Sequence, residues 1–160
     1  MAVLEFSTEI NATQKELFDF HTNFKNVAIV TPPVFEVRFV MIPDSMAEGS
    51  EMTVEIKQFG FWIPWDVKVK ELIPNSLLVD YQSGRGPFKS WKHKHLFTIR
   101  NSRTVLTDRI EYQLPFGILG LLVDIILMRF IQKMVFAYCH KKTKEYFSIR
   151  WSKKNFYTAI

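Results

Sequence analysis

The chain has 160 residues, of which 48% are hydrophobic and 23% charged, and its formal net charge is +5. This composition excludes a disordered or fibrous chain, and the length suits one domain, residues 1–160, with a sizeable core and a basic tail at about 150–160. The positive charge permits weak attraction to anionic surfaces. The sequence contains no nucleic-acid-binding motif, so no nucleic-acid partner is expected.

The chain also carries signals about its compartment. Cys139 is the only cysteine, so no intramolecular disulfide can form, which fits a reducing compartment. The first ten residues lack the basic and apolar segments of a signal peptide. The most apolar run, residues 118–128, is shorter than the roughly 18 residues of a membrane-spanning helix and contains Asp124. We therefore expect a cytoplasmic protein in which this run belongs to the core.

The N-terminal third predicts one strand and two short helices. Residues 3–10 alternate between apolar and polar side chains, as in a strand. Thr13 and Glu16 then have capping-box spacing, which predicts a helix over residues 14–21. A second short helix is predicted over residues 24–31, before two prolines. The first helix is expected to bury three side chains: Leu17, Phe18 and Phe20.

Six further strands are predicted between the short helices and residue 114. They cover residues 34–42, 50–59, 63–73, 76–84, 88–100 and 104–114. Their connections are short, which predicts an antiparallel meander. Residues 59–66 are rich in aromatic rings and are read as a loop. This loop is either a cavity mouth or a cap formed by three rings: Phe61, Trp62 and Trp65.

A long helix is predicted from about residue 118 to residue 147. Its apolar positions recur at helical spacing at Leu127, Phe130, Ile131, Met134, Ala137 and Tyr138. The opposite face contains Arg129, Gln132, Lys133, His140 and Lys144. We therefore expect His140 at the surface or boundary, and also His21, which ends the first helix. The predicted fold class is α+β: a curved, seven-stranded antiparallel sheet gripping a long C-terminal helix, with two short helices after the first strand.

Residues 86–99, GPFKSWKHKHLFTI, contain the most unusual pattern of the chain. In a strand, one face would carry Trp91, His93, His95, Phe97 and Ile99, and the other would carry Lys92 and Lys94. Because lysines favour water, His93 and His95 are expected on the inner face. The following strand pairs with this one across a hairpin, and its inner face is expected to carry Asp108, Ile110 and Tyr112.

These strands predict a lined cavity. For the strand that carries Asp80 and Gln82, the inner face is not decided, because both faces contain polar and apolar residues. If Gln82 points inwards, the candidate ligand-binding residues are Trp65, Gln82, Phe88, Trp91, His93, His95, Phe97, Asp108, Ile110 and Tyr112.

Four interpretations of the two histidines remain open. They are structural residues with buried hydrogen-bond partners, or they orient a mostly apolar ligand together with Trp91 and Tyr112. Alternatively, His93 or His95 acts with Asp108 as a general acid or base. The His-x-His spacing could also serve a metal, with Asp108 as a third ligand. Since no further histidine or cysteine lies near in sequence, neither a metal nor another cofactor is expected.

Several strings resemble a known superfamily. The string INATQKELFDFHTNFKNVAIVTPP, the string DYQSGRGPFKSWKHKHLF and the string TDRIEYQLPFGILG are similar to START-like helix-grip (SRPBCC) proteins. The second and third of these strings resemble a bacterial branch of cyclase/dehydrase-like proteins. The resemblance implies a ligand cavity between the sheet and the C-terminal helix. The superfamily includes lipid carriers, hormone receptors, polyketide cyclases and co-chaperones, so the fold does not select one chemistry.

The expected function is that of a non-enzymatic carrier or sensor. Its partner would be a small hydrophobic ligand, such as a lipid, an isoprenoid or a polyketide-like ring. One alternative is a cyclase- or aromatase-type enzyme, a lyase or isomerase, that uses His93 or His95 with Asp108. The other is a peripheral membrane or protein-interaction module that uses the basic tail and residues 118–128. The oligomeric state does not follow from the sequence.

Overall fold

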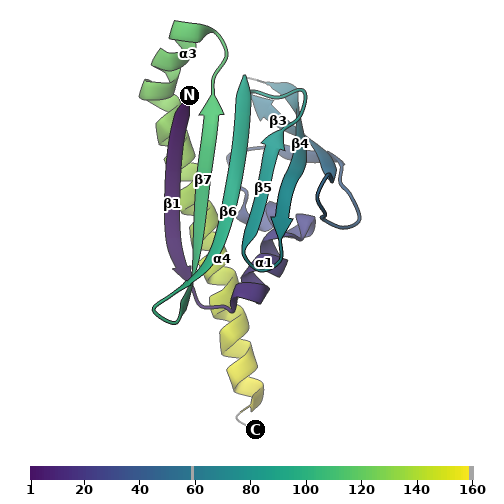
Figure 1. Ribbon diagram of the computed structural model, residues 1–160, viewed down its shortest axis with the longest axis vertical. Coiled ribbons are helices and arrows are strands. Elements are labelled where there is room, and N and C mark those ends of the chain that lie inside the picture. The colour runs from purple at the N-terminus through teal and green to yellow at the C-terminus, as the bar shows by residue number, and fades with distance from the viewer. Residues whose placement is uncertain (59, 159–160) are drawn as a thin grey trace.

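A computed structural model describes residues 1–58 and 60–158, without the side chains of residues 58 and 151–158. Seven strands in this part form one antiparallel sheet in the order β1-β7-β6-β5-β4-β3-β2 (Figure 1). The strands are β1 (Ala2–Ile10), β2 (Val37–Met41), β3 (Glu51–Gln58), β4 (Phe61–Ile73), β5 (Leu77–Gln82), β6 (Ser90–Arg100) and β7 (Arg103–Gln113). The predicted meander is confirmed, and β1 joins it beside β7.

Short helices follow β1, and a long helical segment follows β7. The first group is α1 (Gln14–His21), the 3₁₀ turn η1 (Phe24–Asn26) and α2 (Val27–Val30). The second group is α3 (Gly117–Val123), the π-helical turn η2 (Asp124–Met128) and α4 (Arg129–Thr158). Figure 1 shows α4 crossing one face of the sheet, with α1 near its C-terminal half. The predicted α+β fold is therefore confirmed.

The start of α1 forms the predicted capping box. The Thr13 hydroxyl accepts a hydrogen bond from the backbone N–H of Glu16 at 3.2 Å. The Glu16 carboxylate accepts one from the backbone N–H of Thr13 at 3.0 Å. Such reciprocal bonds satisfy two backbone donors at the helix start. The expected burial of Leu17, Phe18 and Phe20 is also confirmed.

The ring-rich loop prediction for residues 59–66 is wrong from Phe61 onwards, where β4 begins. Phe59 lies outside the described residues. Trp62 and Trp65 lie on opposite faces of β4: the guanidinium of Arg38 covers the Trp62 ring at 3.7 Å, whereas Trp65 contacts interior rings. Each residue here pairs with β3, and the proline of this segment lies opposite Glu55. Ladder pairing therefore extends the strand to the turn.

The interior is divided into two apolar clusters. The lower cluster lies between α1, the sheet and the C-terminal half of α4, and it contains Phe18, Phe20, Phe97, Leu106 and Phe147 among others. The upper cluster lies near α3 and contains Ala2, Ile110, Tyr112 and Phe136, with Phe88 and Trp91 packed against it. The polar side chains described below lie between these clusters.

The buried face of the long helix differs from the predicted one. The structure buries Gln132, Phe136, His140, Thr143 and Phe147, which recur at helical spacing. The predicted apolar face is instead largely outside: Phe130 is 66% exposed, and Leu127 and Met134 are also exposed. The reason is that Asp108 on the sheet requires a hydrogen-bond partner, and the face with His140 supplies it.

Residues 118–128 were expected in the core, and this expectation is also wrong. Ile118 is 79% and Ile126 76% exposed, and most neighbouring side chains of this segment are exposed as well. Gly120 and Asp124 are buried. Figure 1 shows α3 at the end of the sheet where β7 finishes and the N-terminus lies. No helix among residues 1–58 and 60–158 has both the length and the apolarity to span a bilayer.

A close approach of backbone segments determines where α3 begins. Phe116 has a left-handed φ of 70°, and it turns the chain between β7 and α3. A Cβ atom added to Gly120 would lie 2.0 Å from the backbone oxygen of Pro115. No side chain fits there, so glycine is required for this turn to contact the first turn of α3.

Candidate functional site

Six polar side chains meet between the sheet and α4. All four histidines of the chain take part. His93 and His95 come from β6, and the other members come from α1 (His21), β5 (Asp80), β7 (Asp108) and α4 (His140). We call this group the histidine–aspartate cluster. His140 is buried, so the expectation that it lies at the surface or boundary is wrong, whereas His21 is half-buried, as expected of a boundary residue.

Asp108 is the centre of the cluster. Its Oδ1 atom lies 2.9 Å from Nε2 of His93, and its Oδ2 atom lies 2.6 Å from Nε2 of His140. Nδ1 of His95 lies 2.7 Å from Oδ1, although without hydrogen-bond alignment. An ionised carboxylate only accepts hydrogen bonds, so His93 and His140 donate through Nε2. Asp108 therefore joins the sheet directly to α4.

Asp80 is the site residue that the sequence interpretation left undecided. It lies opposite His93 in the pairing of β5 with β6, and it is 91% buried at a relative exposure of 9%. Its Oδ2 atom lies 3.8 Å from Nε2 of His95, which is too long for a hydrogen bond. Its Oδ1 atom has no hydrogen-bond partner among the described residues. The carboxyl group is therefore buried and only loosely paired.

The two buried aspartates have pKa shifts of opposite direction. For Asp80, burial is the main cause and raises the pKa to about 7. For Asp108, burial opposes ionisation, but the imidazoles of His95, His140 and His93 hold its pKa well below the usual range. Burial also lowers the pKa of His21 to about 3, so its imidazole is neutral near pH 7. The cluster thus contains one firmly ionised carboxylate and one that titrates near neutrality.

Aromatic side chains lie beside the cluster, towards the end of the sheet that adjoins α3. The Trp65 and Trp91 rings meet edge to face at 4.7 Å, and Phe88 lies 5.7 Å from Trp65. Trp91 also lies 5.6 Å from the His93 ring. The indole N–H of Trp65 is buried without a hydrogen-bond partner among the described residues. We call Trp65, Phe88 and Trp91 the aromatic wall.

The loop between β5 and β6 is fixed against the aromatic wall. The Gln82 amide donates a hydrogen bond to the backbone oxygen of Phe88 at 2.7 Å. A Cβ atom added to Gly86 would lie 2.0 Å from the Gln82 side-chain oxygen and 2.8 Å from the Trp65 ring. On the other face, Arg85 binds Asp66 through its guanidinium, and this hydrogen bond is the main reason why the pKa of Asp66 falls to about 2.

The remaining predicted ligand-binding residues lie deeper. Phe97 and Ile110 are fully buried in the lower and upper apolar clusters. The Tyr112 hydroxyl donates a 2.5 Å hydrogen bond to Asp124, which also accepts one from Arg129. Burial, followed by this hydrogen bond to Asp124, raises the pKa of Tyr112. Tyr112 thus connects the sheet to the π-helical turn η2.

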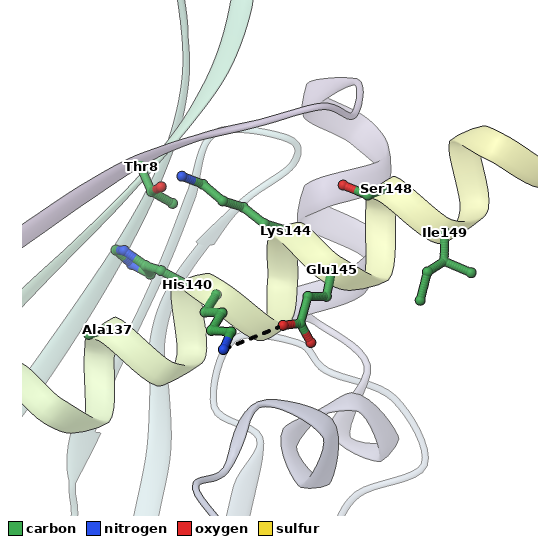
Figure 2. Close-up of a pocket in the computed structure, with 8 residues that line it drawn as sticks. Thr8, Ala137, His140, Lys144, Glu145, Ser148 and Ile149 are labelled. Carbon is green, nitrogen blue, oxygen red and sulfur yellow. Dashed lines mark ion pairs between the residues drawn. The ribbon is translucent and has the colours of Figure 1, made fainter.

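A groove of about 660 Å³ runs between β1 and α4 (Figure 2). Its lining includes Thr8, Ala137, His140 and Lys144, and Figure 2 shows Lys144 extending towards Thr8. His140 therefore belongs both to the wall of this groove and to the histidine–aspartate cluster. His140 is the cluster member that lines the groove.

Cys139 is close to this site but serves packing, as expected. Its thiol donates a hydrogen bond to the backbone oxygen of Val30 at 3.0 Å. Burial raises the pKa of the thiol to about 12. A protonated, hydrogen-bonded thiol is a poor nucleophile.

Sequence reasoning found half of the cluster, because His93, His95 and Asp108 follow from strand alternation alone. Asp80 could have been found from its position opposite His93 once the strand register was known. His140 belongs to a buried series at helical spacing that also contains Phe136 and Phe147. No sequence signal that we recognise points to His21, which contacts His95 from another layer at a ring-centre distance of 5.3 Å.

A curved antiparallel sheet that holds a long C-terminal helix defines the helix-grip class of proteins. Residues 10–137 match the family described as polyketide cyclase/dehydrase and lipid transport. The chain belongs to this family, and with it to the SRPBCC superfamily. No curated protein matches the sequence.

Solved structures share the fold at low sequence identity. A Chromobacterium violaceum protein has 11% identity and a TM-score of 0.70, over 92% of this chain and 98% of its own. The di-domain ARO/CYC StfQ from the steffimycin biosynthetic pathway has 11% identity and a TM-score of 0.72, over 94% and 52%. The major latex-like protein 151 of Panax ginseng has 12% identity and a TM-score of 0.65, over 91% and 97%. These similarities establish the fold alone.

Proposed function

We propose that the protein binds a small hydrophobic molecule between its sheet and α4, as a carrier or sensor. The apolar body of the ligand lies against the aromatic wall, and its polar end faces the histidine–aspartate cluster. The family includes polyketide cyclases, dehydrases and lipid transport proteins, so ligands of this general kind fit the family. The single cysteine suggests a reducing compartment, which is consistent with a cytoplasmic carrier.

The observation that carries this proposal is the combination of aromatic rings with unpaired buried polar atoms. The indole N–H of Trp65 and the Oδ1 atom of Asp80 are both buried without hydrogen-bond partners in the described part of the chain. Burying an unpaired polar group costs about 1–3 kcal/mol. A ligand with one polar end would recover part of this cost, while its apolar body gains about 25 cal/mol per Å² of buried area.

The first test is to identify and displace the ligand. Native mass spectrometry of the protein isolated from its own host should detect a bound apolar molecule. Trp91→Ala should weaken the binding of that molecule at least about tenfold, because a large ring leaves the wall. Trp62→Ala is the matched control, since Trp62 lies on the other face of the sheet beneath Arg38. An apo mass, together with no displacement of a fluorescent lipid analogue, would refute the proposal.

The alternative of a cyclase-type enzyme makes a different prediction for the same site. His93 is fixed by Asp108 and adjoins the aromatic wall through Trp91, an arrangement that suits an acid or base. If the protein is an enzyme, His93→Gln should abolish turnover of the identified ligand while its affinity changes only a few-fold. If the protein is the carrier that we propose, the wild type and the His93→Gln variant both release the ligand chemically unchanged.

A second candidate function rests on the exposed apolar segment. We define this segment as residues 116–130, whose exposed side chains include Phe116, Ile118, Leu119, Ile125, Ile126 and Phe130. Exposed apolar surfaces of this kind mark interaction sites. The only acidic residue in the segment, Asp124, is buried and bonded to Tyr112 and Arg129. Two exposed lysines lie near its ends. The backbone N–H of Lys89 donates a hydrogen bond to the oxygen of Gln113, just before the segment, and Lys133 follows the segment in sequence.

We propose that this segment contacts an anionic lipid surface. Apolar side chains beside basic ones are typical of helices that lie in a membrane interface. The aromatic wall is at the same end of the sheet, because Trp91 pairs with Tyr112 near the end of β7. A hydrophobic ligand could therefore pass between a membrane and the interior without crossing water. The basic side chains of residues 151–160, which were expected to contribute, lie outside those described.

Vesicle co-sedimentation tests the membrane contact. The protein should bind phosphatidylglycerol vesicles, and Leu119→Asp with Ile126→Asp should reduce the bound fraction at least tenfold. Val40→Asp is the control, since Val40 is 60% exposed on β2 and lies outside the segment. Raising the salt concentration should weaken binding, because ions screen the basic residues. A stable dimer that these substitutions abolish, without vesicle binding, would assign the segment to a second copy of the chain and refute membrane contact.

A further inference from the structure

Three members of the histidine–aspartate cluster form a set with metal-binding chemistry. Asp80, His93 and His95 each present one potential ligand atom, and these atoms all lie within 4.8 Å of one another. We propose that these three side chains bind a divalent transition-metal ion of the zinc type. This inference goes beyond the proposed hydrophobic-ligand function and does not depend on it.

The distance between Asp80 and His95 is the first argument. Oδ2 of Asp80 and Nε2 of His95 are 3.8 Å apart. A hydrogen bond would require a shorter separation. Two ligands of one tetrahedral zinc ion, each about 2.0–2.1 Å from the metal, lie about 3.3 Å apart. A small rotation of either side chain would therefore bring both atoms to coordination distance.

The lack of other partners is the second argument. Asp80 is 9% exposed, and its Oδ1 atom has no hydrogen-bond partner in the described part of the chain. Nε2 of His21 is also buried and unpartnered there, and its ring lies 5.3 Å from the His95 ring. A buried carboxylate is normally paired with a cation or binds a metal. In this cluster, the only nearby groups that could become cationic are imidazoles.

Asp108 supplies the third argument, because it orients the two imidazoles. It contacts Nε2 of His93 and Nδ1 of His95, so the other ring nitrogen of each remains available for a metal. Metal-bound histidines usually direct their second nitrogen to a carboxylate in this way, which fixes the ring and strengthens the ligand. A divalent ion would also balance the charges of Asp80 and Asp108.

The donor set selects the class of metal. Two imidazole nitrogens and one carboxylate oxygen favour zinc or a neighbouring transition metal over magnesium and calcium, which prefer oxygen ligands alone. Three protein ligands leave a fourth position open, as in catalytic zinc sites. The groove between β1 and α4 is lined by His140 at the edge of the cluster. Asp80 thus replaces Asp108, which the sequence indicated as the third ligand.

The test uses the full chain after treatment with a chelator. Titration with Co²⁺, followed by visible absorption, should show one ion per chain in a low-symmetry, four-coordinate site, and Zn²⁺ should displace it. Asp80→Asn should lower the Co²⁺ affinity at least tenfold, whereas Asp80→His should retain it because histidine is also a ligand. Asp19→Asn is the control, since Asp19 is exposed on α1.

If a variant does not fold, the wild-type protein alone still tests the proposal. Zn²⁺ should then shift the nuclear magnetic resonance signals of the His93 and His95 rings at one equivalent of metal. Failure to bind one equivalent of Co²⁺ at micromolar concentration would overturn the proposal. It would also be overturned if a folded Asp80→Asn variant bound Co²⁺ as tightly as the wild type. Neither result would affect the hydrophobic-ligand proposal, which native mass spectrometry tests separately.

Discussion

Replacing Asp108 by asparagine is expected to lower the free energy of unfolding by about 3–5 kcal/mol. The Asp108 carboxylate is buried and contacts His93, His95 and His140 at 2.6–2.9 Å. An amide has only one acceptor atom and adds an N–H group, so it cannot accept from all of these rings. The loss should therefore include at least one unpaired buried imidazole. Urea-induced unfolding, followed by circular dichroism, measures the change.

Asp19→Asn provides the control for the Asp108 measurement. Asp19 pairs with Lys15 on the exposed face of α1, where the two side chains are 54% and 72% exposed. Exposed pairs of this type contribute at most about 0.5 kcal/mol. If Asp108→Asn costs no more than Asp19→Asn, the cluster does not join the sheet to α4. If Asp108→Asn is too unstable to titrate, His140→Gln should still unfold at lower urea than the wild type, because it breaks the same link.

The elements of the fold could be predicted because their signals are local. Alternation identified the strands, and the capping box at Thr13 placed the start of α1 correctly. The error at residues 59–66 arose because aromatic residues and Pro64 suggested a loop. In the structure, pairing with β3 extends β4 through both, as Trp62 opposite Lys57 shows. Such pairing depends on a neighbouring strand rather than on the residues of the segment itself.

The face of the long helix that is buried against the sheet could not be predicted from the spacing of its apolar residues. The buried face contains His140 because Asp108 lies opposite it, and this contact joins residues 32 positions apart. The apolar side chains of residues 116–130 then remain outside, where hydropathy alone would not place them. A polar group inside a sheet can thus reverse the face that a helix presents to the sheet. The same effect hid His140 from the list of candidate site residues.

The second large effect is expected from Phe97→Ala, which should cost about 3–5 kcal/mol of unfolding free energy. Phe97 was a candidate ligand-binding residue, but its side chain is fully buried in the lower apolar cluster. Its ring meets Phe18 edge to face at 5.5 Å and lies parallel to the His95 ring at 6.3 Å. Truncation therefore removes packing on both sides and leaves a cavity between α1 and the sheet.

The comparison of Phe97 with Phe61 separates packing from ligand binding. Phe61 is 75% exposed at the start of β4, so Phe61→Ala should change the free energy of unfolding by less than about 0.5 kcal/mol. Phe97→Leu, which keeps much of the volume, should cost less than Phe97→Ala and serves if the alanine variant does not fold. In folded Phe97→Leu, ligand affinity should stay close to that of the wild type. A large loss of affinity with unchanged stability would instead place Phe97 in the ligand cavity and move that cavity below the histidine–aspartate cluster.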